Sequence, residues 1–326
     1  MKSRYLKALA IVLLGAIAVV SIWVGSQYRR DVQRARAGVA SGSHVVATRC
    51  GEIEYADSGS GPPILLIHGA GGGFDQGMIL AGSFVPTGYR VIAMSRFGYL
   101  RTPAPEHASI ALQADAHACL LDALGVGRAA VISASAGAPS ALEFALRHAQ
   151  RCDALVLVVP GWFAFPERAS RRFGPLAKVV FEWVLQSDFA FWVICRFFPD
   201  AAIKSVLGTP PNIVAQASAQ ERARVDSMMW SILPISQRST GLSLEARLTV
   251  ERLSRPLESL QVPTLTISAK DDLYGTLENA QFIVNHVPHA RLVEFSTGGH
   301  LLVGHSEEVL VTIGHFLEAN RTAANR

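Results

Sequence analysis

The sequence predicts an α/β protein with a mostly parallel central sheet flanked by helices, preceded by an N-terminal transmembrane helix. Three observations lead to this prediction. Short apolar runs alternate with helical patterns after residue 44, the alternation stops between Val159 and Pro263, and Ala8–Ser26 is a nearly unbroken apolar stretch. Alternating strands and helices form parallel sheets covered on both faces. With 326 residues, 50% of them hydrophobic, the chain can bury a sizeable core.

The stretch Ala8–Ser26 carries no charge. Its length is close to the roughly 20 residues that span a bilayer and exceeds the about 7–15 residues of a signal-peptide core. No convincing A-x-A-type cleavage site follows it. We therefore expect residues 1–28 to be a retained membrane anchor rather than a cleaved signal peptide, and residues 29–43 to be a linker.

Basic residues flank the apolar stretch on both sides, so the positive-inside rule is nearly balanced. We slightly favour an orientation with the following domain outside a bacterial cytoplasmic membrane, because single N-terminal anchors commonly act as export signals. A chain that begins near residue 40 is expected to be soluble and active.

The core is expected to comprise residues 44–160 and 259–320. Its clearest helices are Ala111–Leu124 and Ala138–Gln150, with a further helical pattern at Glu307–Leu317. The expected strands are His44–Ala47, Ile64–Ile67, Arg90–Met94, Ala129–Ile132, Ala154–Val159, Thr264–Ser268 and Arg291–Phe295.

Residues 161–258 interrupt the alternation and are expected to form several helices separated by prolines. Packing on the core would account for most of the apolar residues in this segment, and their excess favours an apolar substrate. The residues in question are Phe173, Val179, Val180, Phe181, Trp183, Val184, Phe189, Phe191, Trp192, Phe197 and Phe198.

The stretch I-S-A-S-A-G at Ile132–Gly137 places Ser135 between a predicted strand and a predicted helix. Small neighbours on both sides allow the sharp turn that exposes a nucleophilic serine. Ser133 stands where the usual G-x-S-x-G pattern has its first glycine.

An acid and a base follow Ser135 in the chain. Asp271 and Asp272 come directly after one predicted strand, and His300 follows the next one. A serine becomes nucleophilic when an imidazole takes its proton and a carboxylate holds that imidazole in the right tautomer.

A glycine-rich loop, H-G-A-G-G-G at His68–Gly73, follows the predicted strand Ile64–Ile67. Glycines allow backbone N–H groups to face a developing oxyanion. A phosphate-binding loop is the alternative, but the sequence lacks G-K-[ST] and the spacing of a dinucleotide motif.

Together these motifs resemble the α/β-hydrolase superfamily, in its lid-bearing branch of bacterial esterases and meta-cleavage-product hydrolases. The resemblance spans roughly residues 45 to 318. The motifs are H-G-A-G-G-G, S-R-F-G-Y at Ser95–Tyr99, S-A-S-A-G at Ser133–Gly137, A-K-D-D at Ala269–Asp272 and G-G-H at Gly298–His300.

The resemblance implies Ser135 as nucleophile, His300 as general base and acid, and Asp272 as orienting carboxylate, with Asp271 as the alternative. It implies oxyanion N–H groups at Ala70 and Ala136, with Gly71 as the alternative to Ala70. It also implies that residues 161–258 are a helical lid inserted after the sixth core strand. His68 would belong to the scaffold of its loop, and His305 would be structural.

The implied function is a serine hydrolase that cleaves a carboxylic ester of an apolar substrate through an acyl-enzyme. A membrane-facing lid that admits lipid-like esters is a narrower hypothesis. Hydrolysis of a C–C bond, thioester or lactone, or acyl transfer, would use the same triad. The alternative from another class is a non-catalytic ligand-binding protein of this fold. A serine at the elbow argues against the related epoxide hydrolases and haloalkane dehalogenases, which have aspartate there.

Composition excludes other classes. The net charge of +4 without a basic run excludes a nucleic-acid surface. We expect no cofactor. The four cysteines lie far apart without metal-ligand spacing, so we expect neither zinc nor a disulfide, but buried free thiols. The oligomeric state stays open.

Overall fold

The computed structural model describes residues 2–161, 184–248 and 251–324. An eight-stranded sheet with the order β1-β2-β4-β3-β5-β6-β7-β8 forms its centre. β1 and β2 pair antiparallel, as do β2 and β4, and the other neighbours are parallel. The strands are β1 (His44–Thr48), β2 (Gly51–Ser58), β3 (Pro63–Ile67), β4 (Arg90–Met94), β5 (Ala129–Ala134), β6 (Cys152–Val158), β7 (Thr264–Ala269) and β8 (Arg291–Phe295).

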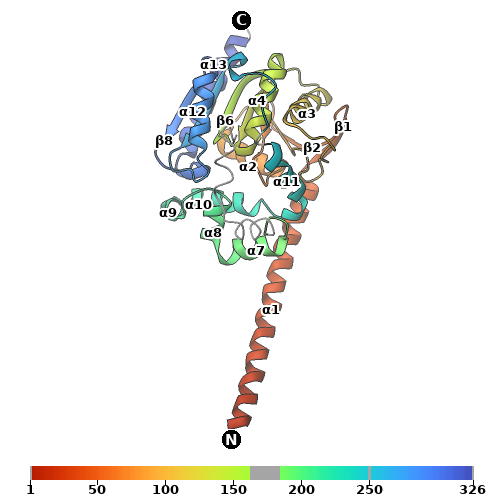
Figure 1. Cartoon of the computed structure of the whole chain (residues 1–326), viewed down its shortest axis with the longest axis vertical. Helices are drawn as coiled ribbons and strands as arrows, with labels where there is room; N and C mark the ends of the chain where they lie inside the picture. Colours follow the sequence, from red (N-terminus) through yellow and green to blue (C-terminus); the bar gives the residue numbers. More distant parts are fainter. Residues whose placement is uncertain (1, 162–183, 249–250, 325–326) are drawn as a thin grey trace.

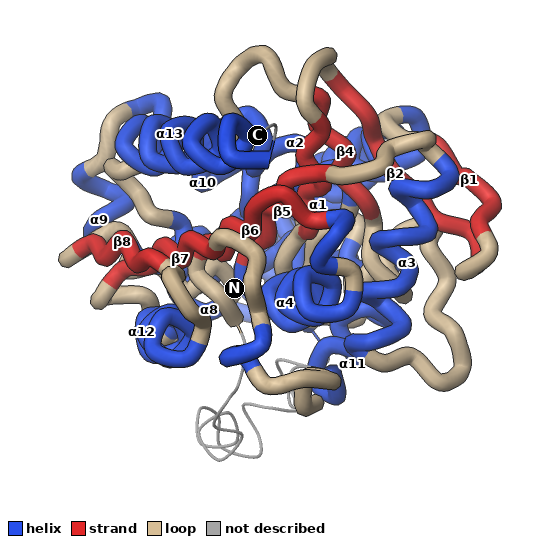
Figure 2. Tube along the Cα trace, turned by 90° about the horizontal axis from the view of Figure 1, so that it is seen from above, coloured by secondary structure: helices blue, strands red, loops and turns tan. Residues whose placement is uncertain are grey.

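Helices cover both faces of this sheet (Figure 2). Successive side chains of β3 point to opposite faces, as strand geometry requires. Ile64 and Leu66 pack in one buried cluster with α2 (Phe74–Phe84) and α13 (Ser306–Ala324). Leu65 and Ile67 pack in the other, whose helices are α3 (Ile110–Ala123), α4 (Ala138–Arg147) and α12 (Thr276–His286). The α/β fold is therefore confirmed.

The strand β2 was not predicted. Its sequence, GEIEYADS, is too polar to resemble a buried strand. The structure accommodates this because Glu54, fully buried in β2, forms an ion pair with Arg101 at 2.7 Å and accepts a hydrogen bond from Ser95. A buried carboxylate is tolerated when it is paired in this way.

The N-terminal helix α1 (Lys2–Ser41) is continuous and projects from one end of the domain (Figure 1). Leu9–Ser41 could span a membrane by length and composition, with a mean hydropathy of 2.4 in its apolar window and none of that window buried. The expected linker at 29–43 is instead helical as far as Ser41. Val32 and Val39 are buried against the domain, which explains why the helix does not stop at the end of the apolar stretch.

Between β6 and β7 the described residues form helices, as predicted. They are α7 (Asp188–Phe197), α8 (Pro199–Ser205), α9 (Pro211–Gln216), α10 (Ala219–Trp230) and α11 (Ser239–Leu248). Several of the apolar residues singled out in this segment lie outside the described residues: Phe173, Val179, Val180, Phe181 and Trp183.

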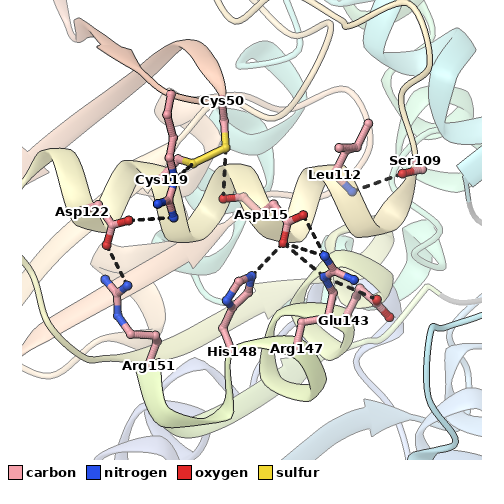
Figure 3. Close-up of polar contacts among 11 residues, drawn as sticks. Cys50, Ser109, Leu112, Asp115, Cys119, Asp122, Glu143, Arg147, His148 and Arg151 are labelled. Carbon is pink, nitrogen blue, oxygen red and sulfur yellow. Dashed lines mark hydrogen bonds and ion pairs between the residues drawn. A yellow bond between two sulfur atoms is a disulfide. The ribbon is translucent and has the colours of Figure 1, made fainter.

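The expectation of four free thiols is wrong. Cys50 and Cys119 form a disulfide between the β1–β2 turn and α3 (Figure 3). Cys152 and Cys195 are free and buried. The two bonded cysteines are 69 residues apart, and they meet because β1 and β2 form a hairpin that lies beside α3. Without β2 in the prediction, that proximity could not be foreseen.

Candidate active site

Ser135 occupies a tight turn between β5 and α4. Its φ of 47° is in the left-handed region, which non-glycine residues rarely adopt. Nearby glycines make the turn possible, because a Cβ on Gly137 would lie 2.7 Å from the His68 carbonyl oxygen. Ser133, in contrast, is fully buried within β5. The turn thus presents Ser135 and not Ser133.

Three side chains from three separate loops form a hydrogen-bonded chain. His300 Nε2 lies 2.9 Å from Ser135 Oγ, and His300 Nδ1 lies 2.8 Å from Asp272 Oδ2. An ionised Asp272 accepts from Nδ1–H, so the lone pair of Nε2 faces the serine hydroxyl. This is the arrangement in which an imidazole removes a proton from serine.

The two adjacent aspartates do different things. Asp272 is buried and also accepts from the Tyr274 N–H at 2.7 Å and from the Thr276 hydroxyl. Burial alone would raise the pKa of Asp272, but the charge of His300 and these hydrogen bonds outweigh it and lower the pKa. Asp271 instead accepts from the backbone N–H groups of Gly298 and Gly299, at 3.2 and 2.8 Å. It therefore holds the loop that carries His300.

Two backbone N–H groups beside Ser135 are available for an oxyanion. Within the described parts of the chain, no protein group accepts from the N–H of Ala70 or Ala136, and both residues line the cavity that contains Ser135. The N–H of Gly71 is engaged, since it donates to the Tyr99 hydroxyl at 3.4 Å. The N–H groups of Ala70 and Ala136 are thus better placed to bind an oxyanion than a pair that includes Gly71.

A buried ion pair supports this region, and the sequence analysis did not identify it. Arg96 pairs with Glu245 of α11 and donates to the carbonyl oxygen of Gly69 at 3.1 Å. That oxygen and the N–H of Ala70 belong to one peptide group, so Arg96 also orients the N–H. The motif S-R-F-G-Y after β4 contains Arg96 and so pointed to one partner of this ion pair. The other partner, Glu245, lies 149 residues farther along the chain and could not be inferred from the motif.

The other two histidines near these motifs do not reach the serine. His68 accepts from the Arg96 N–H at Nε2, and its Nδ1 contacts the Gly69 carbonyl oxygen at 2.7 Å. Its burial and the neighbouring guanidinium of Arg96 lower its pKa well below the usual value, so it stays neutral. His305 stacks on Phe295 at 4.1 Å between ring centroids. Both are structural.

A cavity of about 490 Å³ adjoins Ser135, within the usual range for small-molecule sites. Helices of the segment between β6 and β7 contribute to its wall, and its lining is mainly apolar. The apolar residues include Leu80, Phe84, Val158, Leu185, Val206, Leu207, Met228, Ile232, Leu242 and Leu301.

Comparison with known proteins agrees with this geometry. A family model described as the alpha/beta hydrolase fold matches residues 62–304. This chain belongs to the α/β-hydrolase family. It is therefore a hydrolase, as the sequence predicted.

Individual relatives of this α/β-hydrolase are distant. The 2-hydroxy-6-oxo-6-phenylhexa-2,4-dienoate hydrolase of Burkholderia cepacia is 32% identical over 257 residues, covering 76% of this chain and 84% of that enzyme. The enzyme of the same name from Comamonas testosteroni is 26% identical with the same coverage. Among solved structures, an alpha/beta hydrolase fold protein from Nakamurella multipartita has a TM-score of 0.67 and 26% identity, over 85% of this chain and 99% of that one.

Proposed function

We propose that this α/β-hydrolase is a membrane-anchored serine hydrolase that cleaves carboxylic esters of apolar acids. The observation that carries the proposal is the hydrogen-bonded chain from Ser135 through His300 to Asp272. Its serine end lines an apolar cavity. A protein of this fold that only bound a ligand would not need these three groups in that order.

The reaction takes two steps on these residues. Ser135 Oγ attacks the ester carbonyl while His300 Nε2 takes the hydroxyl proton, and the N–H groups of Ala70 and Ala136 bind the oxyanion. The C–O bond breaks as His300 returns the proton to the departing alcohol, which leaves an acyl-Ser135. Water, deprotonated by His300, then attacks the acyl group, and release of the acid returns the proton to Ser135.

The cavity's charges favour a neutral substrate. Among the described residues that line it, Arg224 is the one Lys or Arg, and its guanidinium is already held by Glu221 at 2.7 Å and by the carbonyl oxygen of Leu301 at 2.8 Å. A carboxylate on the substrate would be desolvated there without an unpaired cation to receive it. A neutral ester avoids that penalty.

Hydrolysis of a C–C bond is the second candidate, because the relatives described above carry the name of a dienoate hydrolase. The same serine, histidine and aspartate would serve. The carboxylate of such a substrate and the paired state of Arg224 argue against it here.

The proposed anchor is α1, with the catalytic domain outside the cytoplasmic membrane. The disulfide between Cys50 and Cys119 supports this orientation, since disulfides persist in oxidising compartments and are rare in the cytosol. The disulfide thus favours the outside of the membrane for the catalytic domain, a choice that the nearly balanced basic residues on the two sides of the apolar stretch do not make.

The test combines active-site labelling with a substrate panel. Detergent-solubilised protein is treated with a fluorophosphonate probe and assayed with short-, medium- and long-chain p-nitrophenyl esters and with 2-hydroxy-6-oxo-6-phenylhexa-2,4-dienoate. Ser135→Ala should lose labelling and about 10⁶ in kcat, whereas Ser133→Ala, a change in the same motif, should keep both. Absence of labelling in the unaltered protein, or normal turnover by Ser135→Ala, would sink the proposal.

A further inference from the structure

The helix α7 is bonded to the part of α1 that follows its apolar stretch. The indole N–H of Trp192 donates to Asp31 at 2.9 Å, and Arg36 pairs with Asp188 at 3.0 Å. Asp188 also accepts from Ser236, which ties the same junction to the residues before α11. α7 therefore has a defined position relative to α1.

Aromatic rings continue this junction along α7. Tyr28 of α1 contacts Phe189 and Trp192, with ring centroids 5.1 and 5.6 Å apart, and Trp192 contacts Phe197 at 5.7 Å. Trp192 is fully buried, but Phe189, Phe197 and Phe198 are 47, 44 and 59% exposed. We name these three exposed residues the α7 aromatic face.

Phe189 of the α7 aromatic face lies at the height where a bilayer around α1 would end. Tyr28 is two residues beyond Ser26, about 3 Å along the helix axis. The headgroup region extends roughly 5–8 Å beyond the hydrocarbon core on each side. Phe189, in contact with Tyr28, thus falls within it. Figure 1 shows α7 and α8 at the end of the domain from which α1 projects.

Charges around the α7 aromatic face suit a membrane surface. Arg29 and Arg30 are exposed on α1 directly after Tyr28, and Arg196 is exposed beside Phe197. Aromatic rings with neighbouring basic side chains are characteristic of segments that lie in the interface of anionic bilayers.

The same segment leads directly to the active site. α8 follows α7 and is seven residues long, about 10 Å. The residues after it, Val206 and Leu207, line the cavity. The Tyr274 hydroxyl donates to the carbonyl oxygen of Val206 at 2.8 Å, and the Tyr274 ring packs edge-on against His300 at 4.8 Å.

We propose that the α7 aromatic face lies in the headgroup region of the bilayer that holds α1, and that the substrate is an acyl ester lipid taken from that bilayer. This inference rests on the proposed anchor and hydrolase activity. Its two parts, membrane contact and substrate class, are tested separately.

Membrane contact is measured with an environment-sensitive fluorophore on the full-length protein in phosphatidylcholine–phosphatidylglycerol vesicles. The label is attached at Phe198→Cys and, as a matched control, at Val311→Cys, because Val311 is 49% exposed on α13. Burial raises the pKa of Cys152 and Cys195, which keeps these thiols unreactive. The label at 198 should show blue-shifted emission and quenching by spin-labelled lipid, and the label at 311 neither.

Two outcomes would overturn membrane contact. One is identical emission from the two labels. The other is a shielded label at 198 that becomes water-exposed when the protein is diluted in lipid, because that result would indicate a second copy of this chain as the occupant.

Substrate class is measured with the double variant Phe197→Ser/Phe198→Ser. We expect at least a tenfold slower hydrolysis of an acyl ester lipid in vesicles, and unchanged hydrolysis of a soluble short-chain ester. If the double variant and the unaltered protein hydrolyse the vesicle ester at equal rates, the proposed substrate class is overturned. Failure of the unaltered protein to cleave the soluble ester would overturn the proposed function instead, while the fluorescence experiment would still report on the membrane contact.

Discussion

The active-site loops and the junction between α1 and α7 are held together in different ways. At the active site, backbone turns at the ends of neighbouring strands present Ser135, Asp272 and His300, and each loop is short. At the junction, single side-chain contacts join residues that are far apart in sequence, such as Asp31 with Trp192. Local backbone geometry can be recognised from sequence, and isolated long-range contacts cannot.

The largest effect beyond loss of the serine should come from Asp272. Asp272→Asn keeps the shape of the side chain but favours the wrong tautomer of His300, and should lower kcat by about 10⁴. Asp271→Asn, its matched control, only weakens two hydrogen bonds to the loop of His300 and should cost far less. Steady-state kinetics on a soluble ester measures both. The reverse ranking would mean that the loop, not the carboxylate at His300, controls the reaction.

A smaller effect is expected from Arg96→Lys. A lysine keeps the charge but cannot contact Glu245 and the Gly69 carbonyl oxygen together, so the N–H of Ala70 loses its fixed direction. Because removal of a whole oxyanion donor costs about 10²–10³ in kcat, misdirection of one should cost about 10–100-fold, with KM little changed.

The control for Arg96→Lys is Arg90→Lys, which weakens a partly exposed ion pair with Asp57 between β4 and β2 and should leave kcat unaltered. An increase in KM at constant kcat would show that Arg96 acts on substrate binding rather than on the oxyanion.

The junction itself is tested by truncation. From sequence we expected a chain that begins near residue 40 to be active, but the structure places buried residues of α1 before that point. A chain starting at residue 43 loses the burial of Val32 and Val39 and should be less stable by about 3 kcal/mol. A chain starting at residue 24 keeps these contacts and serves as the control. Equal melting temperatures would show that α1 contributes nothing to the domain.

The disulfide provides the last test, with the smallest expected effect on catalysis, because it lies outside both regions. The double variant Cys50→Ser/Cys119→Ser should lose about 2–4 kcal/mol of unfolding free energy, without a change in kcat. Denaturant unfolding with and without reductant measures this: reductant should destabilise the unaltered protein and leave the variant unchanged. A lack of response to reductant in both would mean that the thiols are not bonded in solution.

The sequence predicted the features that depend on local backbone geometry and missed those that depend on long-range side-chain contacts. The apolar strands were predicted because continuous hydrophobic runs characterise parallel strands. Ser135, Asp272 and His300 were selected from their places after strands, and the structure brings all three together. The polar strand β2, the helical continuation of α1 and the partner of Arg96 were missed. Each involves contacts between residues far apart in the sequence, such as Glu54 with Arg101 and Arg96 with Glu245.

If α1 is the membrane anchor proposed above, its unbroken helix restricts how the enzyme can search for its substrate. Its 40 residues form one helix without a proline, which joins the apolar stretch to the residues that pack on the domain. With α1 in a bilayer, the domain can diffuse laterally and rotate about the helix, but it cannot turn its active site away from the membrane or reach far into solution. Its encounter rate is then set by surface density and lateral diffusion rather than by bulk concentration.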